Sequence, residues 1–119
     1  NYDYVLIEGA GGLYVPLNDD EYIIDLIKSI SLDTILVTNG SLGSINHSLL
    51  SIESLYNNNI NLAGIIFNSF PENNPEIIQN NKEEILKYML KKFPAAKFWN
   101  IPVIRDFEND CPLVSFEGV

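Results

Sequence analysis

The fold is decided by residues 34–49, which read TILVTNGSLGSINHSL. The first five residues are mostly β-branched and apolar, which predicts a buried strand. Glycines at positions 40 and 43 predict a loop after that strand. Apolar side chains then recur every three or four residues, which predicts an amphipathic helix. The residues of this helical stripe are Ile45, Leu49, Ile52 and Tyr56.

The same alternation continues on both sides of this unit. Upstream, Tyr4–Ile7 is an apolar run that predicts a buried strand, and residues 19–30 predict a helix with an acidic start. Downstream, we expect a strand over Ile60–Phe67, a helix over residues 75–93 and a weak strand at Lys97–Trp99. The order β-α-β-α-β-α-β predicts an α/β fold, with a parallel sheet covered by helices on both faces. The buried faces of the two flanking helices are expected at Ile23, Leu26, Ile27 and Ile30, and at Ile78, Ile85, Met89 and Phe93.

Composition limits the classes of function. The 119 residues, 46% of them hydrophobic, suffice for one compact domain. Seven Lys and Arg against sixteen Asp and Glu give a net charge of −9, which argues against nucleic-acid and anionic-membrane partners. No stretch approaches the roughly 20 apolar residues that a membrane span needs. The single cysteine, Cys111, permits no internal disulfide, so a reducing cytoplasmic location is expected.

Ligands of parallel α/β sheets bind outside the carboxyl ends of the strands, where unusual residues gather in this sequence. Glu8 follows the first expected strand and begins the run Glu8-Gly9-Ala10-Gly11-Gly12. A carboxylate at a strand end suits Mg²⁺, and glycines let backbone N–H groups approach an anion. The alternative is an ordinary turn with a solvated glutamate.

The second candidate is the run Ser41–His47. Ser44 could cap the following helix, whose first N–H groups could hold a carboxylate or phosphate, with Asn46 as a further donor. The alternative is a capped helix with no ligand. His47 is the only histidine, so it is interpreted as a structural or surface residue rather than a metal ligand.

Two more candidates follow the later strands. The amide of Asn68, with Ser69 beside it, could pair with a purine edge, or could simply start a turn. The segment Ile101–Ile104 could stack on a base, or could be a strand that leads into a loop. The acidic residues that follow it are interpreted as a solvated tail. The chain contains no G-x-x-x-x-G-K phosphate loop.

Together these segments resemble the C-terminal half of dethiobiotin synthetase, a family of P-loop-type enzymes of biotin biosynthesis. The glycine block with its following proline and the Leu-Gly-x-Ile-Asn-His block are together the most specific features. The matching segments are Val5–Leu13, Val15–Leu17, Leu42–Leu50, Ala63–Asn68 and Asn100–Pro102.

The resemblance implies a P-loop NTPase-like three-layer fold and an ATP- and Mg²⁺-dependent ring closure. In that reaction 7,8-diaminopelargonic acid captures CO₂ as a carbamate, ATP phosphorylates the carbamate, and the second amine closes the ureido ring. A homodimer is also implied, because in the family the Leu42–Asn46 block reaches a site across the subunit interface.

The resemblance also implies residue roles. Glu8 would be a Mg²⁺ ligand, and Gly9, Ala10 and Gly11 would line the nucleotide and substrate side of the same loop. The adenine would be held by Asn68, Ser69, Pro102, Val103 and Ile104. The substrate carboxylate would be held by Leu42, Gly43, Ser44, Ile45 and Asn46, with Gly11 also on the substrate side.

Some features of the family are replaced or lacking. A tyrosine that assists the substrate carboxylate in some members falls near Asn80, and an acidic residue after the adenine asparagine is Ser69 here. The acidic residue that would hold the ribose is nearest to Glu108, with Asn109 as the other possibility. The phosphate loop, the catalytic lysine and a second Mg²⁺ carboxylate lie upstream of the matched region in the family.

Residues 1–119 are therefore expected to be the C-terminal half of one α/β domain, inactive without the other half and with no catalytic residue of their own. Two alternatives remain at this point. One is another P-loop amide synthase, similar to cobyrinic acid amide synthase, and the other is a non-catalytic binding module on the same fold.

Overall fold

The structure is a computed structural model that describes residues 1–71, 74–104, 106 and 109. The chain divides into two compact units, Asn1–Leu32 and Asp33–Val119. No helix in the described part of the chain is both long and apolar enough to cross a membrane.

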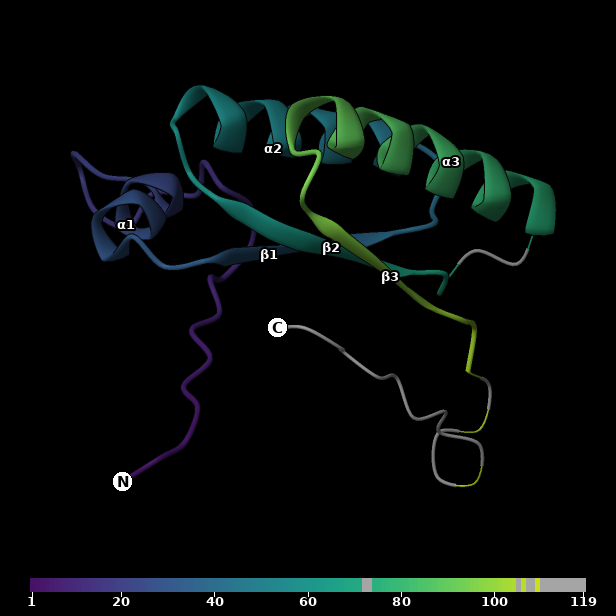
Figure 1. Cartoon of the computed structure of the whole chain (residues 1–119), viewed down its shortest axis with the longest axis horizontal. Helices are drawn as coiled ribbons and strands as arrows, with labels where there is room; N and C mark the ends of the chain where they lie inside the picture. Colours follow the sequence, from purple (N-terminus) through teal and green to yellow (C-terminus); the bar gives the residue numbers. More distant parts are fainter. Residues whose placement is uncertain (72–73, 105, 107–108, 110–119) are drawn as a thin grey trace. The chain divides into compact units, whose positions relative to one another are not determined.

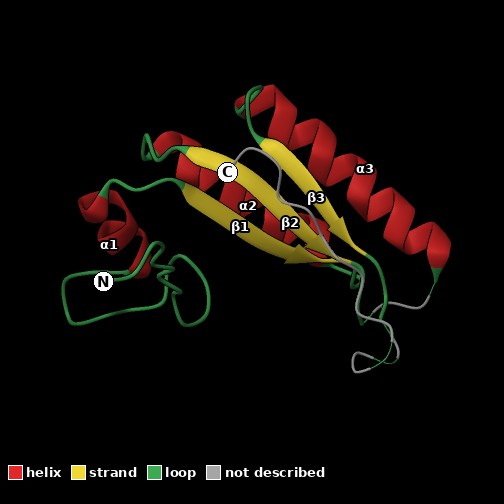
Figure 2. Cartoon of the chain, turned by 60° about the horizontal axis from the view of Figure 1, so that its bottom comes forward, coloured by secondary structure: helices red, strands yellow, loops and turns green. Residues whose placement is uncertain are grey.

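The second unit is built on a three-stranded parallel sheet with the strand order β1-β2-β3 (Figures 1 and 2). The two helices α2 and α3 lie side by side on one face of this sheet (Figure 1). The parallel α/β fold is thus confirmed, although both described helices of this unit cover the same face. The elements are β1 (Thr34–Asn39), α2 (Ser44–Asn57), β2 (Leu62–Asn68), α3 (Pro75–Lys92) and β3 (Lys97–Ile101).

The core lies between the central strand β2 and the two helices. Ile65 and Phe67 of β2 have no exposed surface, because the strand has neighbours on both sides and helices above it. Gly64 also belongs to β2, and a Cβ at this position would lie 2.7 Å from the carbonyl oxygen of Lys97. Strands β2 and β3 therefore pass too close for any side chain there. The largest fully buried side chains are Phe67, Ile52, Leu55, Ile65, Ile85 and Met89.

The strand register aligns the three carboxyl ends. Asn39 at the end of β1 pairs with Asn68 at the end of β2, and Asn68 pairs in turn with Ile101 at the end of β3. The loops that follow β1, β2 and β3 therefore all leave the sheet at one edge, which is the edge where ligands of such folds bind.

The helical faces differ in part from the expected stripes. In α2 three of the four buried positions lie one residue before the predicted ones, and Tyr56 is exposed; Ile52 is buried as predicted. Serines occupy two of the buried positions, and an apolar pattern cannot detect them. In α3 the predicted Ile85 and Met89 are buried, but the unpredicted Asn81 is buried with them. The buried residues of α2 are Ser44, Ser48, Ile52 and Leu55.

The first unit contains one helix, α1 (Ile23–Ile30), preceded by a long loop. The helix begins where the acidic segment predicted it, and the Asp25 carboxylate accepts a hydrogen bond of 2.9 Å from the backbone N–H of Tyr22. Ile23 is buried as predicted, but the second buried residue is Ile24, and Leu26 is 41% exposed.

The predicted strand Tyr4–Ile7 is wrong as an element of this structure. Its four side chains are between 61% and 93% exposed, and no strand is assigned to these residues. A strand needs a neighbour to pair its backbone groups, and no described strand pairs with this segment.

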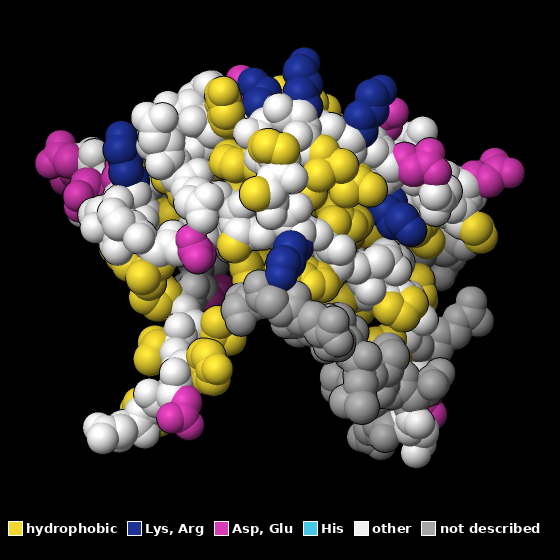
Figure 3. All heavy atoms as spheres, viewed as in Figure 1, with side chains coloured by type: hydrophobic (Ala, Val, Ile, Leu, Met, Phe, Trp, Pro, Cys, Tyr) yellow, Lys and Arg dark blue, Asp and Glu magenta, His cyan; other side chains and the backbone are white. Residues whose placement is uncertain are grey.

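Charge is distributed unevenly over this acidic chain. Four of the seven Lys and Arg residues lie in α3. The space-filling view shows a group of Lys and Arg side chains at the top, where α3 lies in Figure 1 (Figure 3). The four lysines of α3 are Lys82, Lys87, Lys91 and Lys92.

Candidate functional site

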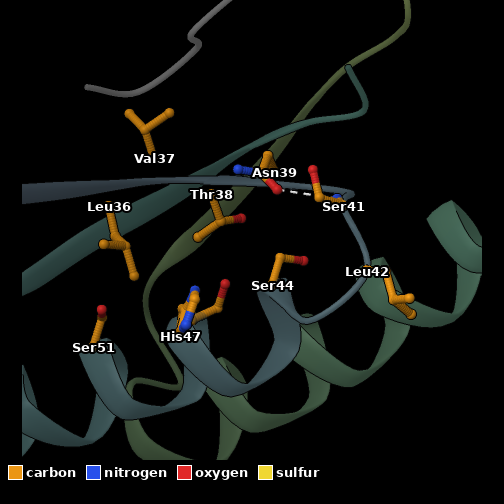
Figure 4. A pocket seen from close by; sticks show the side chains of 10 residues that line it. Leu36, Val37, Thr38, Asn39, Ser41, Leu42, Ser44, His47 and Ser51 are labelled. Atoms are coloured by element: carbon orange, nitrogen blue, oxygen red, sulfur yellow. Dashed lines mark hydrogen bonds between the residues drawn. The ribbon is translucent and has the colours of Figure 1, made fainter. Parts of the chain in front are cut away.

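The loop between β1 and α2, residues 40–43, is held at both ends by hydrogen bonds. The Gly40 N–H donates to the Asn68 carbonyl oxygen at 2.9 Å, which ties the loop to the end of the neighbouring strand. The Ser41 N–H donates to the side-chain oxygen of Asn39 at 3.0 Å (Figure 4). The Ser44 N–H donates back to the Ser41 carbonyl oxygen at 3.0 Å, which closes the turn into α2.

Gly43, and not the expected Ser44, is the N-cap of α2. Gly43 has a φ of +88°, a left-handed conformation that favours glycine, and no side chain caps the helix. Ser44 is the first helical residue and is 93% buried, with its hydroxyl oxygen accepting from the Asn81 carboxamide at 3.3 Å. The Ser44 N–H bonds to the Ser41 carbonyl oxygen, and the N–H groups that follow it have no partners within the helix, an arrangement that can accept an anion.

A hollow of about 630 Å³ lies between the start of α2 and the first turns of α3. It brings together four of the five residues predicted for the substrate carboxylate, and Asn80 lines the same hollow. The amides of Asn46 and Asn80 add donors to the helix N–H groups, whereas the carboxylate of Glu76 opposes an anion. The lining residues are Leu42, Gly43, Ile45, Asn46, Leu49, Glu76, Ile77, Asn80 and Asn81.

A second hollow, of about 310 Å³, lies between β1 and α2 (Figure 4). Its wall includes Ser44, which does not line the first hollow, and Leu42, which lines both hollows. Thr38 also lines it, and the Thr38 hydroxyl is buried without a hydrogen-bond partner in the described structure. His47 lies on the rim and is exposed, which confirms the interpretation of this histidine as a surface residue.

The residues predicted to hold adenine lie at the ends of β2 and β3. Asn68 is the last residue of β2, and its side-chain oxygen accepts from the Phe70 N–H at 3.1 Å, so it also starts a turn. Ser69 is 96% buried, and its hydroxyl donates to the side-chain oxygen of Asn100 at 3.4 Å. Its N–H donates to the Ile101 carbonyl oxygen at 2.9 Å, which places the start of the segment 102–104 beside the Asn68–Ser69 pair.

Two residues were predicted as candidates for the ribose contact, Glu108 and Asn109. Glu108 lies outside the described residues. The alternative, Asn109, donates from its side chain to the Asp106 carboxylate at 3.0 Å.

The glycine loop with Glu8 belongs to the first unit. Gly11 has a φ of +84°, and the Val15 N–H donates to the Gly12 carbonyl oxygen at 3.1 Å, so the glycines form a tight turn. Pro16 then forms an antiparallel bridge with Tyr22, which returns the chain to the start of α1. Glu8 is exposed at the beginning of this loop.

Glu8 offers one carboxylate, an oxygen ligand of the kind that Mg²⁺ takes. The described residues hold no group of three or more His, Cys, Asp or Glu side chains that could enclose a metal ion. Mg²⁺ is commonly held by one or two carboxylates, with water and phosphate oxygens as its remaining ligands. A single exposed carboxylate therefore fits this ion.

Sequence reasoning missed Asn81. This residue is 97% buried in α3, and its carboxamide reaches the β1–α2 loop. The one available signal was position, because Asn81 stands on the helical face that also carries Ile78, Ile85 and Met89. A polar residue on an apolar face is expected to have buried partners.

The chain has recognisable relatives among known proteins. A family model described as an AAA domain matches residues 1–109. The chain belongs to this AAA domain family. The match covers both units and every strand and helix described above.

Individual relatives of the chain carry a more specific name than the family model does. The chain is 42% identical over 97 residues to the ATP-dependent dethiobiotin synthetase BioD 2 of Pasteurella multocida, covering 82% of this chain and 46% of the relative. It is 52% identical over 87 residues to the BioD protein of Halalkalibacterium halodurans, covering 72% and 36%. The predicted resemblance to dethiobiotin synthetases is confirmed.

An archaeal relative extends the match along the chain. The BioD protein of Methanocaldococcus jannaschii is 37% identical over 115 residues, which cover 92% of this chain and 50% of the relative. The chain thus spans half the length, or less, of these three curated relatives.

Proposed function

We propose that the protein acts in the synthesis of dethiobiotin, the ATP- and Mg²⁺-dependent carboxylation and ring closure of 7,8-diaminopelargonic acid with CO₂. The observation that carries this proposal is the hollow at the start of α2, lined by Leu42, Gly43, Ile45 and Asn46. These residues belong to the block that resembles the carboxylate-binding segment of dethiobiotin synthetases, and relatives of that name are 37–52% identical.

The chemistry is a sequence of three bond formations. One amine of the substrate attacks CO₂ and loses a proton, which gives a carbamate. A carbamate oxygen attacks the γ-phosphorus of ATP and ADP leaves, and the second amine then attacks the carbamoyl carbon and expels phosphate. Such a reaction depends on positioning and on neutralisation of charge rather than on a protein nucleophile.

The start of α2 would anchor the end of the substrate that does not react. The substrate carboxylate would accept hydrogen bonds from the free N–H groups of Ile45 and Asn46 and from the Asn46 side chain. Asn80, where some family members have a tyrosine, could supply a further donor from α3. Leu42 and Leu49 would contact the aliphatic part of the substrate.

The ends of β2 and β3 would hold the nucleotide base. The side-chain oxygen of Asn68 already accepts from Phe70, so its amide nitrogen is the group that would donate to a purine nitrogen. Ser69 holds the two strand ends together, and Pro102, Val103 and Ile104 would form an apolar wall against the ring. Glu108 would contact the ribose.

Glu8 would hold Mg²⁺, which supplies charge neutralisation at the phosphates during transfer. The N–H groups of Gly9, Ala10 and Gly11 would face the nucleotide and the substrate. A Cβ at Gly11 would lie 2.9 Å from a methyl group of Val15, so this turn excludes other residues for steric as well as conformational reasons.

We further propose that residues 1–119 are one half of a P-loop-type domain whose phosphate loop and catalytic lysine come from another segment. The length of the relatives supports this, as does the sheet face opposite α2, where the Val37 side chain points (Figure 4) and is 67% exposed, because further elements of such a domain would cover that face. The exposed apolar run Tyr4–Ile7 is also what an unpaired strand of such a sheet would leave. The setting would be the cytoplasm.

A homodimer is part of the proposal. Leu42 in the loop before α2 is 84% exposed and Leu50 within α2 is 58% exposed, so this part of the unit carries apolar side chains that a second subunit would cover. The substrate carboxylate would then be bound by α2 of one subunit and the reacting amines would lie in the site of its partner.

Complementation tests the proposal. The chain is produced together with the N-terminal half of the Pasteurella multocida relative in a bacterium that lacks dethiobiotin synthetase, and growth without biotin is scored. We expect growth from the pair and none from either half alone. Absence of growth, although both halves are soluble and associate, would contradict the proposal.

Thermal shifts separate the remaining candidates. Stabilisation by 7,8-diaminopelargonic acid together with Mg²⁺ and ATP supports the synthetase. Stabilisation by ATP without any effect of the substrate would indicate another ATP-dependent amide synthase, and no response to nucleotide in the complemented pair would indicate a non-catalytic module.

A further inference from the structure

The carboxamide of Asn81 makes three contacts with one short segment. Its nitrogen lies 2.8 Å from the Gly40 carbonyl oxygen, 3.1 Å from the Ser41 carbonyl oxygen and 3.3 Å from the Ser44 hydroxyl. Asn81 itself is only 3% exposed. A single side chain of α3 thus holds both ends of the β1–α2 loop from below.

The carbonyl groups of Gly40 and Ser41 need hydrogen-bond donors, and few donors other than Asn81 are available to them. Buried backbone carbonyls need donors, and a loop between a parallel strand and a helix has no ladder to supply them. Gly40 is also enclosed, because a Cβ there would lie 3.2 Å from the Ser69 carbonyl oxygen. The amide nitrogen of Asn81 therefore supplies a hydrogen-bond donor to the loop where the backbone at Gly40 is enclosed.

These contacts determine where α2 begins. The Ser41 carbonyl oxygen accepts from Asn81 and also from the Ser44 N–H, so the same atom fixes the loop and the first turn of the helix. Gly43 turns through the left-handed region between them. A shift of the Ser41 carbonyl would reorient the free N–H groups of Ile45 and Asn46.

We propose that Asn81 is a positioning residue, which sets the affinity of the α2 N-terminus for the substrate carboxylate without touching the substrate. This inference rests on the proposed function, since it concerns the same hollow. The preceding residue, Asn80, lines that hollow. Two adjacent residues of α3 would then have separate roles: Asn80 would form part of the wall of the site, and Asn81 would hold the β1–α2 loop in place.

The first measurement needs no ligand. Amide hydrogen exchange is followed for Ser44, whose N–H closes the turn, and for Ile65, which is fully buried in the central strand and reports on the whole unit. Asn81→Asp keeps the size of the side chain but replaces the donor by an acceptor. We expect exchange at Ser44 to accelerate about tenfold more than at Ile65, which corresponds to loss of about one hydrogen bond.

A matched control separates positioning from general weakening. Met89→Ala removes a fully buried side chain from the same helix two turns further on. It should accelerate exchange at Ser44 and Ile65 by the same factor. If Asn81→Asp also accelerates exchange at Ser44 and at Ile65 by the same factor, the proposal is overturned.

The second measurement is the Kd for 7,8-diaminopelargonic acid, from chemical-shift changes of the Ile45 and Asn46 amides. We expect about a tenfold weaker Kd in Asn81→Asp and an unchanged Kd in Met89→Ala. An unchanged Kd in a folded Asn81→Asp protein would overturn the positioning role. If the unsubstituted protein does not bind the compound while the exchange result holds, the proposed function fails and Asn81 still positions the loop.

A second variant protects the test against misfolding. Asn81→Gln keeps the amide but lengthens the side chain by one methylene, so it should displace the loop rather than release it. We expect a folded protein with a weakened Kd. If neither variant folds, Asn81 is a determinant of folding and the proposal is overturned.

Discussion

Two glycine-containing loops of this chain differ in how they are built. The loop Glu8–Gly12 in the first unit is shaped by its own backbone, through a turn closed by the Gly12 carbonyl oxygen, and its carboxylate is exposed. The loop from Gly40 to Gly43 in the second unit is held by a buried carboxamide, by the end of β2 and by the Asn39 side chain. The first presents an exposed carboxylate and the second presents a fixed geometry.

This difference predicts whether a substitution in each loop mainly lowers activity or mainly lowers stability. Substitution of an exposed ligand removes chemistry while the fold persists, because few packing contacts are lost. Substitution around a confined loop disturbs packing first and chemistry only as a result. Activity and stability should therefore separate between the two regions.

The largest expected effect is on activity, from Glu8→Gln. In the enzyme assembled from this chain and the N-terminal half of a relative, turnover should fall about a hundredfold, since a neutral amide is a poor Mg²⁺ ligand. The free energy of unfolding should change by less than about 0.5 kcal/mol. Asp20→Asn, another exposed acid of the first unit, is the control and should leave turnover unchanged. Equal effects of the two substitutions would remove Glu8 from the metal site.

The next effect is on stability, from Gly64→Ala in the second unit. The new Cβ would lie 2.7 Å from the Lys97 carbonyl oxygen and would overlap the Trp99 ring, so β2 and β3 must move apart. We expect the free energy of unfolding to fall by about 2 kcal/mol, measured by urea denaturation. Gly12→Ala is the counterpart in the exposed loop, where a Cβ would meet no atom within 4 Å. A comparable loss there would erase the distinction between the two regions.

Local sequence patterns predict the strand, loop and helix of the second unit, but they do not predict the exposure of the run Tyr4–Ile7 in the first unit. Residues 34–49 predicted β1, the loop and α2 because β-branched runs, glycines and helical spacing are local signals. The run Tyr4–Ile7 has the same local signal but is exposed, because pairing depends on a neighbour that local sequence does not specify.

The candidate site shows the same division. The motif residues Leu42, Gly43 and Asn46 were expected at the start of a helix and share one hollow there. Ser44 and Asn81 were not expected to meet, because they are 37 residues apart and a hydrogen bond at that separation leaves no periodic trace. Buried polar partners of this kind require the tertiary structure.

A smaller effect, of opposite sign, is expected from Thr38→Val. The Thr38 hydroxyl is buried beside α2 with no hydrogen-bond partner in the described structure, which costs about 1 kcal/mol or more. Valine has nearly the same shape, so the free energy of unfolding should rise by about 1 kcal/mol. Thr34→Val at the half-buried start of the same strand is the control and should change little. A destabilised Thr38→Val protein would mean that the hydroxyl does have a partner in solution.

The smallest effect concerns the contact between α2 and α3 at the end remote from the loop. The Glu53 carboxylate accepts from Lys92 at 2.8 Å and from the Tyr88 hydroxyl at 2.6 Å. The Lys92 ammonium also lies 4.5 Å from the centre of the Tyr56 ring. Hydrogen bonds from Lys92 and Tyr88 hold the pKa of Glu53 below its usual range, and the bond to Glu53 raises the pKa of Lys92.

Because its pKa is lower in the folded than in the unfolded chain, ionised Glu53 stabilises the fold at neutral pH. This contribution is lost as the pH falls below about 4.3, the ordinary value for a glutamate, and through the lower value of the folded state. We therefore expect Glu53→Gln to lower the urea midpoint slightly at pH 7 and to match the unsubstituted protein near the acid end. Glu84→Gln, at an exposed position of α3, is the control, and its urea midpoint should not move relative to that of the unsubstituted protein between pH 7 and acid pH. If the urea midpoints of Glu53→Gln and the unsubstituted protein differ as much at acid pH as at pH 7, Glu53 stabilises the helix pair through packing rather than charge. The contact would then be as independent of ionisation as the hydrogen bonds of the neutral Asn81 carboxamide.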